Sequence, residues 1–584
     1  MSGYKPVLYK VCALFLIFTF LSSGASYAGI SQPAASSSNV AELQALAPAE
    51  PILTRDLLAK AAPDECYDGI GVPYPPGPPC EQGVPKVNQA YVWGLAKAGE
   101  NLWFGTAPNV HCQVFGGFLG VVTPHETESW VCEFAESQYS PPLPETIGDW
   151  RPPHIYMYDL FTRTLTEKSP LDPRFRSTAG LRSAGTLGGV VILAGPSLTG
   201  GLNMFAYDAA SGVYLGSANL PEYNNIRKWL VVNGVLYTAV RNIDGGGNVL
   251  RWRGDISDPF QFEVVGNLAS EGAELALHDG RLFVSTWPYL AVTPVRLAGI
   301  FMSPTIPEGG LSADHADDWL KVWQSSDYEP DPVTAATYGG GALASFDGYL
   351  YWGTMHVPFL AAIAHFNVYG TPETQAGVLA GILGSHRAIG IFRGRDFGTE
   401  NEQIELLYGD TWLPVYEYDL ATSTGSWTVA RNNMLVSPLW GSAGFGNFYN
   451  NYTWTMAVFE GQLYVGTMDY SYLFEEGVLL LLEYLLGIPP ETNLELQFPL
   501  PLNPGADLYR FPSAAVPAVA ESLDGVGNYS NYGIRTMIAA DDLFLGSANP
   551  MNLMTDLTDD LPEGGWELIR LFADKPVYLP MVIH

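Results

Sequence analysis

Short apolar strands alternate with tight turns along most of this chain. Seven times, an apolar strand is followed by a turn and by a second apolar strand that ends in Gly-Thr or in similar small residues. Turns such as Asp347-Gly348 and Asn233-Gly234 are hairpin signals, because these residues tolerate the left-handed backbone of a two-residue turn. The pattern predicts seven hairpins, at 92–106, 181–195, 229–240, 274–286, 341–354, 454–467 and 534–547.

A second kind of hairpin follows several of these phrases. It contains an aromatic-x-Tyr-Asp strand or a variant of it, then a polar turn and another strand, at 154–167, 204–218, 249–266 and 415–429. Residues 564–572 are similar to a last outer strand. Two hairpins make one four-stranded sheet, and recurrence at this period is typical of a repeat architecture. The sequence therefore predicts an all-β fold, a seven-bladed β-propeller over residues 91–575.

Long insertions interrupt the repeats directly after some of the Gly-Thr markers. They occupy 107–150, 355–410 and 468–528. In propeller geometry these loops open on the same face as the start of the innermost strands, so we expect them to gather on one face. Long loops in a compact fold are more often functional than decorative. Within them, 475–487 is apolar nearly all round and predicts a short helix buried under other loops.

The second hairpins resemble the repeats of pyrroloquinoline-quinone-type bacterial propellers, which carry a similar Tyr/Leu-Asp-x-x-Thr-Gly turn. The pattern as a whole, and 531–553 in particular, resembles secreted bacterial β-propellers of uncharacterised role. The resemblance implies the fold and says little about function, since unrelated propellers share this turn.

The beginning of the chain has the features of a secretory signal. Lys5 and Lys10 precede an apolar run at 11–21, and small residues precede a cleavage site after Ala28. An uncleaved anchor is the alternative. We expect a secreted or periplasmic protein with no membrane span in the mature chain. A flexible leader at 29–60, an irregular Cys/Pro-rich segment at 61–90 and an apolar tail at 576–584 complete the predicted organisation.

Charge and cysteine content narrow the classes of partner and site. The net charge is −32 with only 28 Lys and Arg residues, so nucleic acid is excluded as a partner. Four cysteines follow the predicted signal, an even number that predicts two disulfides in an exported chain. Nearest neighbours would pair Cys66 with Cys80 and Cys112 with Cys132, and two other pairings are open.

Arginines recur near the start of the innermost strands. Arg182, Arg227 and Arg535 stand at nearly equivalent repeat positions, so we expect them to point toward one mouth of the central channel. Guanidinium groups suit carboxylate, sulfate or phosphate ligands. The alternative is that each arginine pairs with an acidic residue across a blade boundary.

Four further polar residues follow the strand markers. His111, His356, Asp469 and Asn549 occupy matching places in different repeats. Side chains that converge from several blades would suit a metal ion or a general base, and otherwise they are hydrogen-bonded loop residues. Calcium is a possible cofactor at the acidic runs 314–318, 327–331 and 556–560, although none has the EF-hand spacing.

Asn451, Asn531 and Tyr532 also stand at repeat-equivalent places. Asparagine and tyrosine at a pocket mouth suit sugar hydroxyls, and they equally suit turn formation. The sequence thus predicts a propeller whose looped face and channel mouth bind a small or extended polar ligand, carbohydrate-like (a glycan) or anionic. The alternatives are an enzyme on the same face, either a hydrolase or lyase or a quinone-dependent oxidoreductase, and a cell-surface interaction module.

Overall fold

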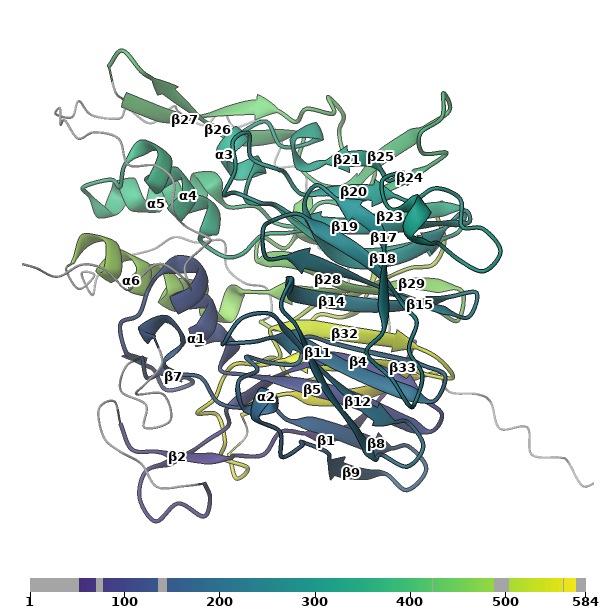
Figure 1. The fold of residues 1–584 in the computed structure, drawn as a ribbon. Coiled ribbons are helices and arrows are strands. Elements are labelled where there is room, and N and C mark those ends of the chain that lie inside the picture. The colour runs from purple at the N-terminus through teal and green to yellow at the C-terminus, as the bar shows by residue number, and fades with distance from the viewer. Residues whose placement is uncertain are drawn as a thin grey trace, which may run out of the picture.

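A computed structural model describes residues 52–69, 77–134, 144–422, 424–487, 504–559 and 561–573. The described residues form many antiparallel strands, and the longer helices gather on one side of them (Figure 1). The predicted signal at 1–28 and the predicted tail at 576–584 lie outside the described residues.

All seven predicted hairpins are present, and each belongs to a four-stranded antiparallel group that we call a unit. Three units follow one another as β10 (Ser183–Leu187), β11 (Val190–Pro196), β12 (Leu202–Asp208) and β13 (Tyr214–Leu220); β14 (Tyr223–Val232), β15 (Val235–Asn242), β16 (Gly247–Trp252) and β17 (Phe262–Leu268); and β18 (Glu271–His278), β19 (Arg281–Trp287), β20 (Gly299–Met302) and β21 (Leu320–Gln324). The others are β4 (Gln89–Ala98), β5 (Asn101–Pro108), β8 (Ile155–Asp159) and β9 (Thr164–Glu167); β22 (Gly339–Phe346), β23 (Tyr349–Met355), β24 (Ile391–Arg395) and β25 (Gln403–Tyr408); β28 (Asn450–Phe459), β29 (Gln462–Asp469), β30 (Leu508–Phe511) and β31 (Val519–Ser522); and β32 (Gly533–Ala539), β33 (Leu543–Ala548), β34 (Glu567–Phe572) and β1 (Thr54–Lys60).

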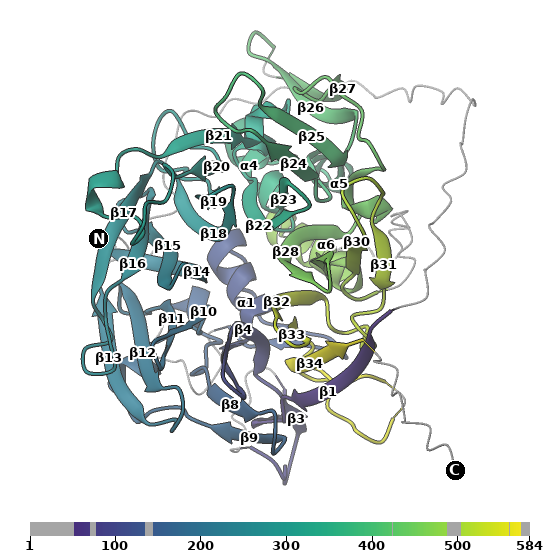
Figure 2. The same ribbon diagram turned by 90° about the vertical axis from the view of Figure 1, so that its right-hand side faces the viewer.

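The first strands of the units lie around a common axis. Figure 2 looks along this axis and shows β4, β10, β14, β18, β22, β28 and β32 facing the centre, with α1 behind it. Each of these strands contacts the first strand of the following unit, and β32 contacts β4. The units therefore form a closed ring around a central channel.

The glycine of the recurring Gly-Thr marker lies where neighbouring units touch. A Cβ added to Gly546 in β33 would lie 2.5 Å from the Cβ of Val92 in β4, and one added to Gly353 in β23 would lie 2.2 Å from the Oγ1 of Thr453 in β28. Real Cβ atoms do not come this close to another heavy atom. The marker is therefore explained by packing between units, which leaves no room for a side chain there.

The strand β1 corrects one prediction from the sequence. Residues 29–60 were expected to be a flexible leader, but Thr54–Lys60 pairs with β34 and completes the last unit. The C-terminal part of the chain supplies only three strands of that unit, and the outer edge of β34 would otherwise leave backbone N–H and C=O groups without strand partners. The two ends of the described chain thus meet in one sheet.

The hairpin at 415–429 corrects another prediction. Its strands, β26 (Trp412–Asp419) and β27 (Thr424–Arg431), form a separate two-stranded sheet rather than the outer half of a unit. That outer half is β24 and β25, which come from the insertion predicted at 355–410. β24 pairs with β23, and β25 pairs with β24. The β26–β27 hairpin instead packs on the helical side, where Tyr416 and Trp427 contact His365.

The longer helices come from the three predicted insertions. These are α1 (Val110–Val114) with a π-helix at Phe115–Leu119, α4 (Leu360–Tyr369), α5 (Gln375–Ser385) and α6 (Ser471–Leu486). Their apolar residues form one core with Tyr91, Trp454 and Tyr532 from the first strands. We call this layer the cap. The prediction of a buried helix at 475–487 is confirmed, because Val478 and Leu481 of α6 are fully buried.

Shorter elements complete the described structure. They are β2 (Glu65–Tyr67) with β3 (Val84–Lys86), β6 (His125–Glu126) with β7 (Val131–Cys132), α2 (Pro173–Arg176), α3 (Pro332–Ala335), and 3-10 turns at Glu145–Ile147, Ala313–His315, Ser325–Asp327 and Ala443–Gly446. No helix among the described residues has the length and apolar character needed to span a membrane.

One disulfide closes a loop in the N-terminal segment, and the other links α1 to β7 within the 107–150 insertion. They join Cys66 to Cys80 and Cys112 to Cys132, which is the nearest-neighbour pairing. Both cysteines of the second bridge are buried. Disulfides of this kind are typical of proteins exported to an oxidising compartment.

Candidate functional site

Three arginines from different units meet inside the central channel. Arg182 precedes β10, Arg227 lies in β14 and Arg535 lies in β32. Arg535 is 3% exposed and Arg227 is 7% exposed, while Arg182 is partly buried. Each guanidinium lies within electrostatic range of the others, because the positive charges of Arg227 and Arg535 lower the pKa of Arg182 and that of Arg535 lowers the pKa of Arg227.

These guanidinium groups have few protein partners. Arg182 donates to Oδ1 of Asn225 at 2.9 Å, and Arg227 approaches Sδ of Met355 at 3.7 Å. In the described part of the chain, no ion pair includes any of the three arginines. Nε and Nη2 of Arg535 are buried without a hydrogen-bond partner, and so is Nε of Arg182. The alternative in which each arginine pairs with its own carboxylate does not describe this arrangement.

Tryptophan rings hold the three arginines in place. The guanidinium carbon lies 5.1 Å from the ring centre of Trp93 for Arg182, 4.3 Å from that of Trp287 for Arg227, and 5.8 Å from that of Trp454 for Arg535. An aromatic face attracts a cation without accepting its N–H groups in conventional hydrogen bonds. The guanidinium edges therefore stay available for a ligand.

A cavity of about 200 Å³ lies in the channel beside the arginines. Its wall includes Arg227, Lys228, Glu274 and Arg535, together with the middle and the turn-proximal halves of the first strands. Val231, at the turn-proximal end, is 46% exposed. The cavity thus opens toward the hairpin turns of the first strands, which Figure 2 shows facing the viewer.

The opposite end of the channel is filled by the cap. Tyr91, Tyr532 and Trp454 are in mutual ring contact there, and Tyr470 at the start of α6 packs on Tyr532 with ring centres 6.3 Å apart. We expected the arginines to serve a mouth on the face that carries the insertions. The insertions instead fold into apolar helices that cover this end, so the cavity lies on the other side of the arginines.

Burial and mutual repulsion raise the free energy of the charged form of the three arginines. Burial lowers the pKa of Arg227 and of Arg535 to about 10, and it lowers the pKa of Arg182 well below its usual range. The Glu274 carboxylate partly offsets this effect at Arg535, and it also lies 3.8 Å from Nζ of Lys228. One carboxylate is thus shared among several cations, and the channel has an excess of positive charge.

The other predicted metal or acid–base residues do not come together. His111 packs against Trp130, and burial lowers its pKa to about 3. His356 forms a 2.8 Å hydrogen bond with Oγ1 of Thr354, and Asp469 accepts from the Ser471 N–H at the start of α6. Within the described ranges these residues form no group that could hold a metal ion.

The predicted asparagines are buried in hydrogen bonds of the scaffold. Asn451 donates to the Arg387 carbonyl, Asn531 to Glu567 and Asn549 to the hydroxyl of Ser530. They secure the starts of the first strands and the following loops. The ring of Tyr532 belongs to the cap core. The wall of the channel cavity includes neither these three asparagines nor Tyr532.

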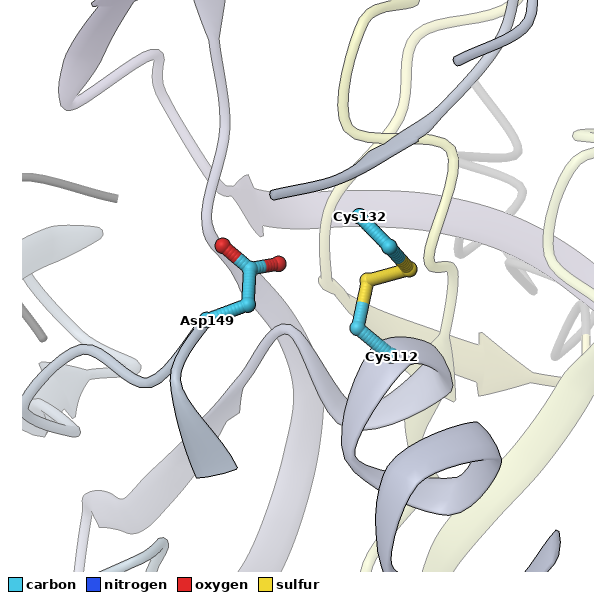
Figure 3. A group of neighbouring side chains, drawn as sticks. All are labelled: Cys112, Cys132 and Asp149. Atoms are coloured by element: carbon cyan, nitrogen blue, oxygen red, sulfur yellow. A yellow bond between two sulfur atoms is a disulfide. The ribbon is translucent and has the colours of Figure 1, made fainter. Parts of the chain in front are cut away.

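A potential metal-ligand group exists beside the second disulfide. Cys112, Cys132 and Asp149 lie close together, and all three are buried (Figure 3). Both sulfur atoms are in the disulfide, so neither is a thiolate that can bind a metal. Asp149 instead belongs to a buried ionic network with Lys86 and Arg151, each 3.7 Å from its Oδ1.

The acidic runs proposed for calcium serve local structure where contacts are defined. Asp331 accepts hydrogen bonds from the N–H groups of Thr334 and Tyr416 and pairs with His365. Asp556 accepts from Thr558 in its own turn. In the part of the chain that the structure describes, none of these runs forms a three-ligand group.

Two features of the site were not recognised in the sequence. Trp93 and Trp454 stand at the same repeat position, twelve residues before Gly105 and Gly466. This equal spacing could have indicated from the sequence that the two tryptophans share a role. Glu274 lies in the first strand of its own repeat, but nothing local distinguishes it from other acidic residues.

Comparisons with known proteins return distant structural matches. No protein-family model matches the chain, and no curated protein does. Structural matches to propeller-fold proteins include a luciferin-regenerating enzyme, with 11% identity and a TM-score of 0.31 over 66% of this chain and 87% of that one. A GH43 endo-arabinanase from Bacillus licheniformis has 12% identity and a TM-score of 0.23, over 49% and 87% of the two chains. Hydrazine synthase from Kuenenia stuttgartiensis has 11% identity and a TM-score of 0.20, over 26% and 46%.

Proposed function

We propose that this chain is an exported, seven-bladed β-propeller that binds an anionic ligand in its central channel through Arg182, Arg227 and Arg535. Each four-stranded unit would be one blade, and β1 would close the ring. The observation that carries the proposal is the buried guanidinium of Arg535, two of whose nitrogens have no hydrogen-bond partner. Buried polar groups are normally paired, and a buried charge without partners is especially costly.

An anion in the cavity would supply the missing partners. Hydrogen bonds between guanidinium and carboxylate, sulfate or phosphate oxygens are short and strong. A negative charge near the axis would also offset the repulsion among the three arginines. This assignment favours the anionic ligand over the carbohydrate-like one, because a neutral sugar would leave that repulsion uncompensated.

The test is the affinity for inorganic sulfate and phosphate, measured by calorimetry on the full chain and on the Arg535→Gln variant. We expect the substitution to weaken binding by roughly 10- to 100-fold, the loss expected for a charged hydrogen bond. Removing a buried charge that lacks partners should leave the melting temperature of the anion-free protein unchanged or higher. A scaffold role for Arg535 predicts the opposite, a lower melting temperature and unchanged anion affinity.

Arg296→Gln is the matched control. Arg296 also lies over an aromatic ring, that of Tyr289 at 5.9 Å, but it is exposed and lies outside the channel cavity. Its substitution should leave anion affinity unchanged. Equal losses in both variants would mean that the affinity reflects general surface charge.

A further inference from the structure

The charge inside the channel exceeds what a single negative group would neutralise. Arg227, Lys228 and Arg535 line the cavity, and Arg182 lies beside them. Lys97 also lines it, but this residue is paired with Asp541 at 3.8 Å. Glu274 is the one acidic residue in this wall. The rest of the molecule is strongly acidic, with a net charge of −32. The channel is therefore a local concentration of positive charge in an otherwise negative protein.

The arginines are also placed to bind more than one anionic group. They come from three different first strands, and each is held over a separate tryptophan ring. Each guanidinium thus has a tryptophan ring as its neighbour, and its N–H donors are suited to anionic oxygens. Because the three guanidinium groups come from different units, each can donate to a separate anionic oxygen of one ligand.

The size of the cavity limits the size of a ligand that could carry the compensating negative charges. A cavity of about 200 Å³ is smaller than the pockets that hold drug-sized ligands, which are about 300–1,000 Å³. The ligand must therefore carry its charges on a short frame. A polymeric anion would reach only the mouth.

Among the described residues, the channel is filled at one end and open at the other. The cap-side end is closed by the packed rings of Tyr91, Tyr532 and Tyr470. At the other end, the cavity wall reaches Val231, whose side chain is 46% exposed, and Lys97 near the β4–β5 turn.

From these observations, and resting on the proposed function, we infer that the ligand is a small polyanion, with two or more negative groups on a short frame, and that it reaches the arginines from the hairpin-turn face. The shared chemistry is several anionic oxygens within one compact molecule. Polycarboxylates and diphosphates both have it, and the experiment separates them.

The first experiment compares acetate, succinate, citrate and pyrophosphate at constant ionic strength and neutral pH, with the full chain and the Arg535→Gln variant. We expect at least one polyanion to bind tenfold or more tightly than acetate, and Arg535→Gln to remove most of this preference. Preference for succinate or citrate identifies a polycarboxylate site, and preference for pyrophosphate identifies a phosphate site.

The outcomes distinguish this inference from the proposed function. If all four anions bind with similar affinity and Arg535→Gln weakens each of them, the channel binds anions and the polyanion inference is overturned. If the variant binds every anion as the unaltered protein does, the arginine site itself is overturned, and the inference falls with it.

The second experiment tests the route of access with Val231→Trp. A larger side chain at the turn-side rim should slow association of the preferred polyanion by tenfold or more, measured by stopped-flow tryptophan fluorescence, with little change in melting temperature. Val429→Trp is the control, because Val429 is also an exposed strand valine, 69% exposed, but lies in the β26–β27 hairpin on the cap side. Equal association rates for the two variants would overturn access from the hairpin-turn face.

Discussion

Buried charges in this molecule are paired in different ways, and the contrast between them is informative. Arg387 donates to both carboxylate oxygens of Glu329, at 2.7 and 3.0 Å, and to the carbonyl oxygen of Pro414. Arg151 is paired with Glu65 in the same manner. Arg535 is as deeply buried as these residues, yet it has tryptophan as its neighbour and no carboxylate within ion-pair distance. The scaffold arginines are satisfied by protein groups, whereas Nε and Nη2 of Arg535 have no hydrogen-bond partner.

A buried carboxyl pair provides a residue-scale test that is independent of the channel. Burial raises the pKa of Asp507 to about 7, with a further contribution from the nearby Asp469, although Asn450 donates to it at 2.7 Å. The folded protein therefore keeps a proton that the unfolded chain, with a carboxyl pKa near 3.8, releases. The stability associated with this group is fully present below pH 4 and is lost as the pH rises to about 7.

We expect Asp507→Asn to remove this pH dependence. The variant should match the unaltered protein near pH 4.5 and exceed its free energy of unfolding at pH 8 by on the order of 3 kcal/mol. Urea unfolding at both pH values measures the difference. Asp244→Asn, at an exposed position, should show no such gain. A variant that is less stable than the unaltered protein at pH 8 would mean that Asp507 is ionised and stabilising.

At the scale of elements, the last unit depends on the N-terminal strand. Leu53, directly before β1, is 8% exposed and packs in one core with Leu543 and Ile569 of that unit. The N–H groups of Ile52 and Leu53 both donate to Oε1 of Glu521, at 2.9 and 2.8 Å. The N-terminal segment is thus held by side-chain packing and hydrogen bonds in addition to the strand ladder.

Leu53→Ala should therefore destabilise the whole fold rather than a flexible end. We expect a loss of about 2–4 kcal/mol, as for other large-to-small changes in a core. Ile52→Ala is the matched control, because Ile52 is 44% exposed and its substitution removes little buried surface. Thermal unfolding of both variants measures the difference, and equal melting temperatures would show that this segment does not contribute to closure of the ring.

At the scale of the whole molecule, the ring is formed by close contact between the units. The recurring glycines allow the second strand of one unit to pack directly on the first strand of the next. The contact between Gly546 and Val92 is the one that joins the last unit to the unit of β4. A side chain there would press apart the two ends of the ring.

We expect Gly546→Ala to lower the free energy of unfolding by about 1–3 kcal/mol, the usual cost of overpacking a core. Gly117→Ala is the control, since a Cβ there meets no atom within 4 Å and the residue lies in a helical turn. The control should be neutral or slightly stabilising. Denaturant unfolding provides the comparison, and a neutral Gly546→Ala would show that the contact between units yields without cost.

The sequence by itself determined the local elements and their repetition. Alternating apolar residues and Gly-containing turns specify hairpins through short-range geometry, so all seven first hairpins, the α6 helix and the near-equivalence of the three arginines were predictable. The disulfide pairing was predictable as one of three possibilities. The positions of the arginines in the repeat were sufficient to predict that their side chains meet.

Only the tertiary structure decided which hairpins join a unit and which end of the channel is open. The 415–429 hairpin has the sequence pattern of an outer pair, but β24 and β25 lie nearer to β23 in the chain and take that place. The pairing of β1 with β34 joins the two ends of the described chain, and no local pattern encodes so distant a partner. The insertions were expected to surround an open mouth of the channel. Their apolar side chains instead pack against one another and away from water, and this packing closes that end of the channel. These outcomes depend on contacts between distant segments, which a sequence pattern does not specify.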